Sequence, residues 1–155
     1  MAADKIKVLY VDDERNNLLS FKATFRKDYR VFIASSGKEG LEILEQNKDM
    51  HVIVTDQRMP EMTGIEFLTA VLELYPDPIR ILLTGYSDIN AVVDAINKGQ
   101  VYRYISKPWN EQEFKITIKN AFEIYALREE NKKLTRDLLK INQQLEFVLR
   151  QKIIS

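Results

Sequence analysis

The 155-residue chain contains no cysteine, and it has only 5 glycines and 4 prolines. Without cysteine the protein can form neither disulfides nor thiolate metal sites. The scarcity of glycine and proline excludes a low-complexity or disordered composition. Hydrophobic residues make up 45% of the sequence, enough for one ordinary core. We therefore expect one globular domain with an appendage.

The chain also lacks an excess of charge and a long apolar run. It has 23 basic and 23 acidic residues, so its total charge encodes no long-range attraction to nucleic acid or to an anionic membrane. No hydrophobic segment has the length needed to span a bilayer, and the N-terminus does not resemble a signal peptide. We expect a cytoplasmic protein that binds neither nucleic acid nor membranes directly.

Five short apolar segments alternate with helical patterns along the first three quarters of the sequence. The predicted strands cover residues 5–11, 29–34, 51–55, 79–83 and 101–106. Ser36 followed by Glu39, Asp88, and Asn110 followed by Glu113 are predicted to begin three of the helices. This alternation predicts an α/β fold, a doubly wound parallel sheet covered by helices on both faces.

Polar residues stand where four of these strands end. They are Asp12, Asp13, Asp56, Thr84 and Lys107. In a parallel sheet these residues project from one edge, where ligands bind in such folds. Three carboxylates in a small space repel one another and suit a hard divalent cation, for which Mg²⁺ is the best candidate. A carboxylate can also attack phosphorus if a metal, an ammonium group and a hydroxyl neutralise the incoming charge.

The motifs closely resemble the receiver domains of response regulators in two-component signal transduction, which have a flavodoxin-like fold similar to that of chemotaxis regulators. The resemblance runs from about Lys5 to about Tyr125. It rests on Asp12-Asp13, on residues 56–64 (DQRMPEMTG), on Thr84-Gly85 and on Lys107-Pro108. It implies a phosphoprotein rather than an enzyme.

The resemblance also implies a role for each acidic residue. Asp56 would accept a phosphoryl group from the phosphohistidine of a sensor histidine kinase. Mg²⁺ would be bound by Asp13, by Asp56 and by the backbone carbonyl of Arg58, and Asp12 would act mainly through a metal-bound water.

The remaining implied roles concern the switch. Thr84 and Lys107 would hold the phosphoryl oxygens, and Tyr104 occupies the aromatic switch position of the family. The resemblance places the changing surface on the fourth helix, fifth strand and fifth helix. Side chains at Arg58 and Tyr86 would influence how water reaches the phosphoryl group, and we expect them to slow hydrolysis.

Taken singly, several of these residues have simpler explanations. Asp12-Asp13 alone would more often be a turn or a helix cap, and Thr84 or Lys107 alone a loop residue. Their joint occurrence at successive strand ends favours the functional interpretation. His51, the only histidine, begins a strand away from the acids, so we expect it to be structural or merely exposed, with no catalytic or ligand role. Trp109 is expected to anchor the last helix.

The last helix continues well beyond the receiver motifs, with no helix breaker as far as Lys152. Heptad position a holds Ile124, Asn131, Leu138 and Leu145, and position d holds Leu127, Leu134, Ile141 and Val148. This spacing predicts a parallel coiled coil, and one Asn at position a favours a dimer. We expect a receiver domain over residues 1–125 and a coiled-coil extension over 126–155.

Alternatives remain for the extension and for the function. Because Leu139, Phe147 and Leu149 lie off the seam, the helix could instead fold back on its own domain. We also expect the chain to be a piece of a longer regulator that continues into an output domain or acts on a downstream protein. The competing functions are a dimerisation scaffold with an inactive receiver fold and an aspartyl-phosphate phosphatase. The phosphatase is disfavoured because such enzymes place their acids as Asp-x-Asp, whereas Asp12 and Asp13 are adjacent.

Overall fold

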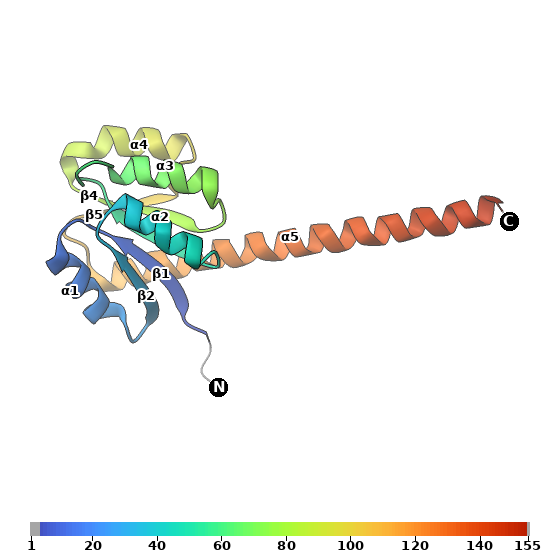
Figure 1. The fold of residues 1–155 in the computed structure, drawn as a ribbon, viewed down its shortest axis with the longest axis horizontal. Helices are drawn as coiled ribbons and strands as arrows, with labels where there is room; N and C mark the ends of the chain where they lie inside the picture. Colours follow the sequence, from blue (N-terminus) through green and yellow to red (C-terminus); the bar gives the residue numbers. More distant parts are fainter. Residues whose placement is uncertain (1–3, 155) are drawn as a thin grey trace.

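Strands and helices alternate throughout residues 4–154, the part of the chain that the computed structural model describes (Figure 1). The strands are β1 (Ile6–Val11), β2 (Tyr29–Ala34), β3 (Val52–Asp56), β4 (Ile79–Thr84) and β5 (Arg103–Ser106). The helices are α1 (Arg15–Phe25), α2 (Gly37–Gln46), α3 (Gly64–Leu74), α4 (Ile89–Asn97) and α5 (Glu111–Ile154), with a 3₁₀ turn η1 (Tyr86–Asp88) before α4. The predicted order of elements is confirmed.

The five strands form one parallel sheet in the order β2-β1-β3-β4-β5. The strand order reverses between β1 and β3, so these two strands are neighbours at the centre. Between β1 and β3 the register pairs Val11 with Thr55. On its other side β3 pairs with β4, which sets Asp56 beside Leu83. The predicted doubly wound α/β fold is confirmed, and the ends of β1 and β3 lie side by side.

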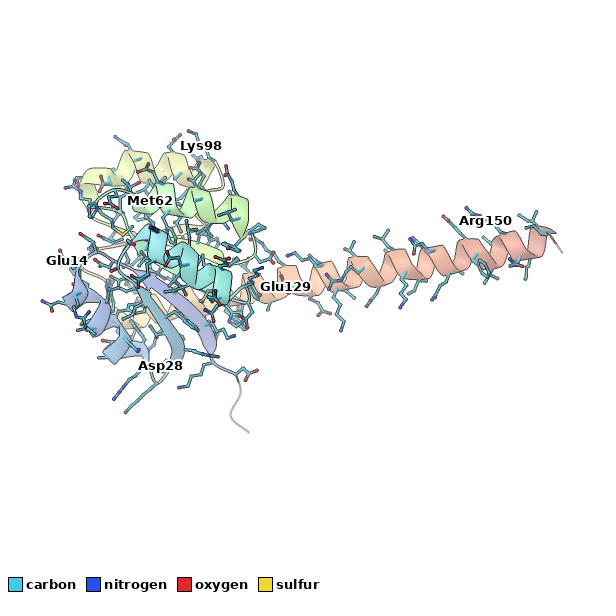
Figure 2. The ribbon with its side chains drawn as sticks, viewed as in Figure 1. Glu14, Asp28, Met62, Lys98, Glu129 and Arg150 are labelled. Atoms are coloured by element: carbon cyan, nitrogen blue, oxygen red, sulfur yellow. The ribbon has the colours of Figure 1, made fainter. Side chains whose placement is uncertain are left out.

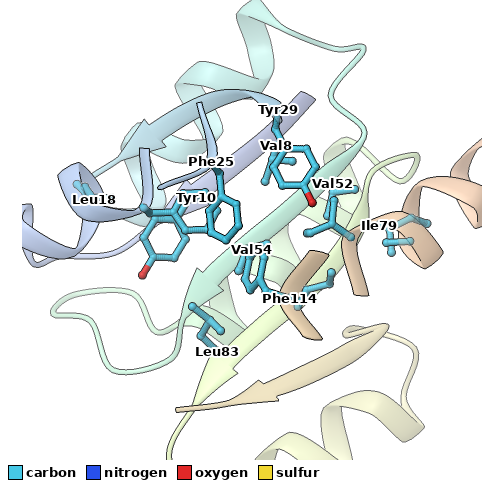
Figure 3. Packing of buried hydrophobic residues seen from close by; sticks show 14 residues of the cluster. Val8, Tyr10, Leu18, Phe25, Tyr29, Val52, Val54, Ile79, Leu83 and Phe114 are labelled. Atoms are coloured by element: carbon cyan, nitrogen blue, oxygen red, sulfur yellow. The ribbon is translucent and has the colours of Figure 1, made fainter. Parts of the chain in front are cut away.

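Two hydrophobic layers cover the sheet. The layer under α1 and α5 is rich in aromatic rings, several of which are visible in Figure 3. Trp109 lies in this layer, with its ring centroid 5.5 Å from that of Phe25 and 5.2 Å from that of Phe114. The structure therefore agrees with its expected role as an anchor for the start of α5. The other layer is aliphatic and lies under α2, α3 and α4.

Two of the three predicted helix caps are present. The Ser36 hydroxyl accepts a hydrogen bond from the Glu39 backbone N–H (3.1 Å), but the Glu39 carboxylate accepts from Ser35, so the capping box is incomplete. At the start of α5, the side-chain oxygen of Asn110 accepts from the backbone N–H groups of Gln112 (2.9 Å) and Glu113 (3.1 Å).

The third cap prediction is wrong, and one capping box was not foreseen. Asp88 occupies the N-cap position of α4, but its side chain makes no capping hydrogen bond. The complete capping box lies at α3, where Thr63 and Glu66 exchange side-chain to backbone hydrogen bonds. The predicted end of α4 at Gly99 is confirmed by its positive φ of 76°.

The 44-residue helix α5 projects far beyond the compact body of the protein (Figure 1). At 1.5 Å per residue it is about 66 Å long. It leaves the body near Glu129, and Arg150 lies far out on the free part (Figure 2). The alternative in which this helix folds back on its own domain is therefore wrong for this conformation. Within residues 4–154, no helix is both long enough and apolar enough to cross a membrane.

Several contacts fix α5 where it leaves the body. The His51 ring meets Phe122 and Tyr125 edge-on, at centroid distances of 5.0 and 4.9 Å. Its Nδ1 accepts a hydrogen bond from the Lys7 backbone N–H (3.0 Å), and burial lowers the pKa of His51 below its usual value. These contacts agree with the structural one of the two alternatives expected for His51. Ile124, the first a position of the predicted seam, packs partly against the core layer under α1 and α5.

Candidate functional site

Three carboxylates converge at the carboxyl edge of the two central strands. Asp12 and Asp13 follow the end of β1, and Asp56 is the last residue of β3. Each contributes one oxygen to a group whose members all lie within 4.8 Å of one another. Asp12 is fully buried and Asp56 is 7% exposed, while Asp13 faces solvent. The predicted acidic cluster is thus assembled by the adjacency of β1 and β3.

Asp12 is held rigidly by neighbouring donors. Its carboxylate accepts hydrogen bonds from the Tyr10 hydroxyl (2.6 Å), the Glu14 backbone N–H (2.9 Å) and the Asn17 amide (3.1 Å). The Tyr10 ring stacks on Phe21 at 4.2 Å, which fixes the hydroxyl in place. Burial, together with the bond to Asp12, raises the pKa of Tyr10 far above its usual range, so the phenol remains a donor. Sequence reasoning missed Tyr10, although residues two apart in a strand share a face.

Lys107 completes the charge arrangement at Asp56. Its ammonium group donates a hydrogen bond to the Asp56 carboxylate, and the same pair forms an ion pair. Burial nevertheless raises the pKa of Asp56 above its ordinary value; Lys107 opposes this effect, while the charges of Asp12 and Asp13 add to it. The surroundings of Asp56, the phosphoacceptor candidate, therefore disfavour the charged form of its carboxyl group.

A hollow of about 270 Å³ opens beside Asp56. Its lining includes Thr84 and Lys107, which sequence reasoning had grouped with the acids. Thr84 is 2% exposed, and its hydroxyl donates to the Gly85 carbonyl oxygen (3.2 Å). The structure thus gathers all five predicted strand-end residues at one edge, with the threonine hydroxyl engaged by its own loop.

Arg58 closes one rim of this hollow. Its guanidinium donates to the Ser87 hydroxyl (2.5 Å) and to the Asp88 carboxylate (3.2 Å), so it joins the loop after β3 to the loop after β4. Nothing in the sequence pattern singled out Ser87 or this use of Asp88. The side chain of Tyr86, which was expected to influence hydrolysis, lies outside the part of the chain that the structure describes.

Gly64 permits α3 to begin directly against the end of β3. A Cβ atom built on this glycine would overlap the backbone carbonyl oxygen of Asp56 and approach a methyl group of Leu82 at 2.7 Å. The Gly64 N–H also donates to the Gln57 carbonyl (3.0 Å). The residue has a steric reason to be glycine, and it fixes the path of the chain after the phosphoacceptor candidate.

Tyr104 lies apart from the acidic cluster. It is half-buried on β5, opposite Leu82 in the register, and packs against the aliphatic layer. It also lines a separate hollow of about 600 Å³ between β5 and α5, next to the exposed Ile116. The described geometry therefore does not bring Tyr104 to Asp56, and its switch role stays a prediction.

The residues present fit a hard divalent cation. Three carboxylates and one ammonium leave the cluster with an excess of negative charge, and all the available ligands are oxygens, as Mg²⁺ and Ca²⁺ prefer. The Asp12 oxygens already accept three hydrogen bonds. Asp13 and Asp56 are therefore the carboxylates best placed to contact a metal directly.

Comparisons with known proteins agree with this geometry. The family profile described as "Response regulator receiver domain" matches residues 8–119. The chain is 35% identical over 123 residues to the hydrogenase transcriptional regulatory protein HoxA of Bradyrhizobium diazoefficiens, covering 79% of this chain and 25% of that protein. It is 34% identical over 138 residues to HoxA of Cupriavidus necator, covering 89% and 28%. The chain thus spans about a quarter of the length of these curated relatives.

Two solved structures are similar to this chain over nearly their whole length. A response regulator receiver domain protein from Clostridium thermocellum superposes with a TM-score of 0.74 at 33% identity, covering 78% of this chain and 97% of that chain. A structure described as adenylate cyclase from Rhodopirellula baltica superposes with a TM-score of 0.82 at 30% identity, covering 85% and 98%.

The bond between Tyr10 and Asp12 yields a stability prediction. Replacing Tyr10 by Phe is expected to lower the free energy of unfolding by about 1–3 kcal/mol, because a buried carboxylate loses a charge-assisted hydrogen bond. Urea denaturation at pH 7 measures the change. The control is Tyr29→Phe, since Tyr29 is also buried but its hydroxyl makes no hydrogen bond that the described residues show. Equal losses in both variants would contradict this account.

The raised pKa of Asp56 predicts a pH dependence of stability in the absence of metal. The folded chain holds the Asp56 proton to higher pH than the unfolded chain, so the free energy of unfolding falls as pH rises above about 3.8. Asp56→Asn removes this loss. The variant is expected to be more stable than the wild type at pH 7 in EDTA, with the advantage shrinking as the medium is acidified.

The control for this prediction is Asp49→Asn, measured in the same urea titrations. Lys7 lowers the pKa of Asp49, so its charged form stabilises the folded state, and the substitution should have the opposite sign. A wild-type protein more stable than Asp56→Asn at pH 7 would show that the Lys107 pair outweighs burial.

Proposed function

The chain belongs to the response regulator receiver domain family, and on that basis we propose that it is a phosphorylation-dependent switch whose phosphoacceptor is Asp56. The observation that carries this proposal is the cluster of Asp12, Asp13 and Asp56, in which Lys107 is bonded to Asp56. Domains of this family are generally not enzymes. The phosphodonor we propose is a sensor histidine kinase.

The site residues would divide the chemistry among them. An Asp56 carboxylate oxygen attacks the phosphorus of the phosphohistidine, and the phosphorus–nitrogen bond breaks as the imidazole leaves. Lys107 is already in contact with Asp56 and neutralises part of the incoming charge. Thr84 would turn its hydroxyl from the Gly85 carbonyl toward a phosphoryl oxygen.

A magnesium ion fits the same residues. Asp13, Asp56 and the backbone carbonyl of Arg58 would hold it, and Asp12 would act through a metal-bound water. When bound, Mg²⁺ would neutralise charge on the phosphoryl oxygens and reduce the repulsion among the carboxylates. The buried, triply hydrogen-bonded Asp12 supports its indirect role.

We propose that the signal leaves through the surface formed by α4, β5 and α5. Thr84 pairs with Ser106 in the register, so movement of the threonine loop reaches β5 directly. Tyr104, on the same strand, would change its position with Thr84. The receiver of residues 1–125 would then act through the extension of residues 126–155 on an output domain or a separate protein.

A phosphorylation assay tests the proposed function. Incubation with acetyl phosphate and Mg²⁺ is expected to add one phosphoryl group, about 80 Da, because the clustered charges are arranged to accept it. Intact mass spectrometry measures the gain, which should vanish with EDTA and in Asp56→Asn. Asp49→Asn should gain as the wild type does. No gain in the wild type would favour a dimerisation scaffold with an inactive receiver fold.

The free part of α5 supports a homodimer. Its apolar seam residues are more than half exposed, from 51% at Val148 to 66% at Leu127. Lys132, whose ammonium contacts Asp77 of the receiver, is five residues from Leu127, or about 140° around the helix. Leu127 is therefore turned away from the receiver side of α5, and from Leu127 onward the exposed seam is open to a second copy.

The polar seam residue and the flanking charges favour a parallel arrangement. In a parallel dimer Asn131 meets its own copy, whereas in an antiparallel dimer it would face an apolar d residue. Glu123 and Arg128, both exposed, stand at g and e positions that approach each other between parallel chains.

A seam substitution tests the dimer. Leu138→Glu is expected to convert a dimer of twice 18.1 kDa into a monomer, because it places two like charges, one from each chain, in one layer of the seam. Light scattering after size-exclusion chromatography measures the mass. Gln143→Glu adds the same charge at an outward position and should leave the dimer intact. A monomeric wild type at micromolar concentration would rule out the coiled coil.

A further inference from the structure

Asp88 stands where a helix cap belongs but does not act as one. It occupies the N-cap position of α4 with φ −107° and ψ 11°, whereas N-cap residues ordinarily have extended backbone. Its carboxylate accepts a hydrogen bond from Arg58 instead. The first turn of α4 therefore lacks the side-chain acceptor that the sequence supplies for it.

The carboxylate of Asp88 has two possible partners, and one geometry excludes the other. Aspartate is among the best N-cap residues, and its negative charge is favourable at the positive end of a helix. To cap α4, Asp88 must change to an extended backbone, which unwinds η1 and withdraws the carboxylate from Arg58. The segment from Gly85 to Asp88 thus has two alternative arrangements with different hydrogen bonds.

Arg58 also has a second possible partner. It lines the same 270 Å³ hollow as Asp56 and Lys107, and its side chain is 71% exposed. A phosphoryl group on Asp56 would place about two negative charges in that hollow. Guanidinium groups bind phosphoryl oxygens with two parallel hydrogen bonds, more strongly than they bind one carboxylate and one hydroxyl at an exposed site.

We propose that Arg58 is a phosphoryl-binding residue that works as a latch: in the unphosphorylated chain it holds Ser87 and Asp88, and on phosphorylation it exchanges them for phosphoryl oxygens. Asp88 is then released to cap α4. Only the second half of this inference, the exchange of partners on phosphorylation, rests on the proposed function. The contacts of Arg58 with Ser87 and Asp88 are present without phosphate.

The latch acts on the loop that carries Thr84. Unwinding η1 moves the segment directly after Thr84-Gly85, and the threonine hydroxyl now bonded to Gly85 becomes free to turn. The far end of α4 stays anchored, because Arg80, only 6% exposed, donates to the carbonyl oxygens of Gly99 (3.2 Å) and Gln100 (3.0 Å). Release at one end and anchoring at the other make α4 pivot about its C-terminus.

Hydrogen exchange of the full chain tests the latch without any phosphodonor. An N-cap side chain accepts from the second or third helical N–H, here Asn90 or Ala91. In Arg58→Ala one of these amides should exchange several-fold more slowly than in the wild type, by NMR. Lys98→Ala, which breaks the exposed pair with Asp94 at the other end of α4, is the control and should change nothing there.

Two substitutions at Asp88 separate capping from a general loosening of the loop. Asp88→Asn retains a good capping group but loses the charged partner of Arg58, so its first-turn amides should be protected as in Arg58→Ala. Asp88→Ala can neither cap α4 nor bind Arg58. Combined with Arg58→Ala, it should abolish the protection of the first-turn amides. Wild-type exchange rates in Arg58→Ala would overturn the latch.

Phosphorylation tests the exchange of partners. After treatment with acetyl phosphate and Mg²⁺, wild-type chains shown by mass to be phosphorylated should reproduce the protection seen in unphosphorylated Arg58→Ala. Phosphorylated chains with unchanged exchange at Asn90 and Ala91 would overturn phosphoryl binding by Arg58. Absence of any mass gain would overturn the proposed function and this second half together, while the unphosphorylated comparison would still decide the latch.

Discussion

The repulsion among three carboxylates within 4.8 Å, opposed by Lys107, is the interaction on which the site depends. Asp56 is nearly buried, so water screens this repulsion poorly. The opposing ammonium comes from the end of β5, two strands away from β3. To reach Asp56 the Lys107 chain passes the end of β4, where its backbone N–H donates to the Thr84 carbonyl (3.0 Å). The charge balance therefore joins the ends of β1, β3 and β5, which carry the carboxylates and the ammonium group.

The same site is rigid on one side and adjustable on the other. Beside β1, the buried Tyr10 and its stacked partner Phe21 hold Asp12 in a single orientation. Beside β4, the contacts are exposed and few, with Arg58 joined to the loop by one hydroxyl and one carboxylate. Exposed ion pairs contribute little stability, so this side can rearrange when charge is added at Asp56. A rigid acidic side and an adjustable loop side suit the two-state switch that we propose.

The sequence predicted the elements well because strand ends, apolar runs and chain reversals are local signals. It also predicted that Asp12, Asp56 and Lys107 would meet, since parallel strands bring their carboxyl ends to one edge. It failed where a local signal competes with a long-range contact: Asp88 has the residue type of a cap, but a partner 30 residues away in sequence takes its carboxylate. The contact of Tyr10 with Asp12 was missed for a different reason, because strand periodicity gives a side chain's face but not its hydrogen bonds.

The course of α5 connects the site with the free rod. The helix is capped by Asn110, three residues after Lys107, and runs back along the sheet to leave at the opposite edge beside His51 and Asp77. One unbroken helix therefore begins next to the charge cluster and ends about 66 Å away. Because Ile124 is partly buried in the receiver core and also belongs to the heptad pattern, the receiver and a dimer seam would share that residue. Any shift of α5 on the sheet would then be felt at the first layer of the seam.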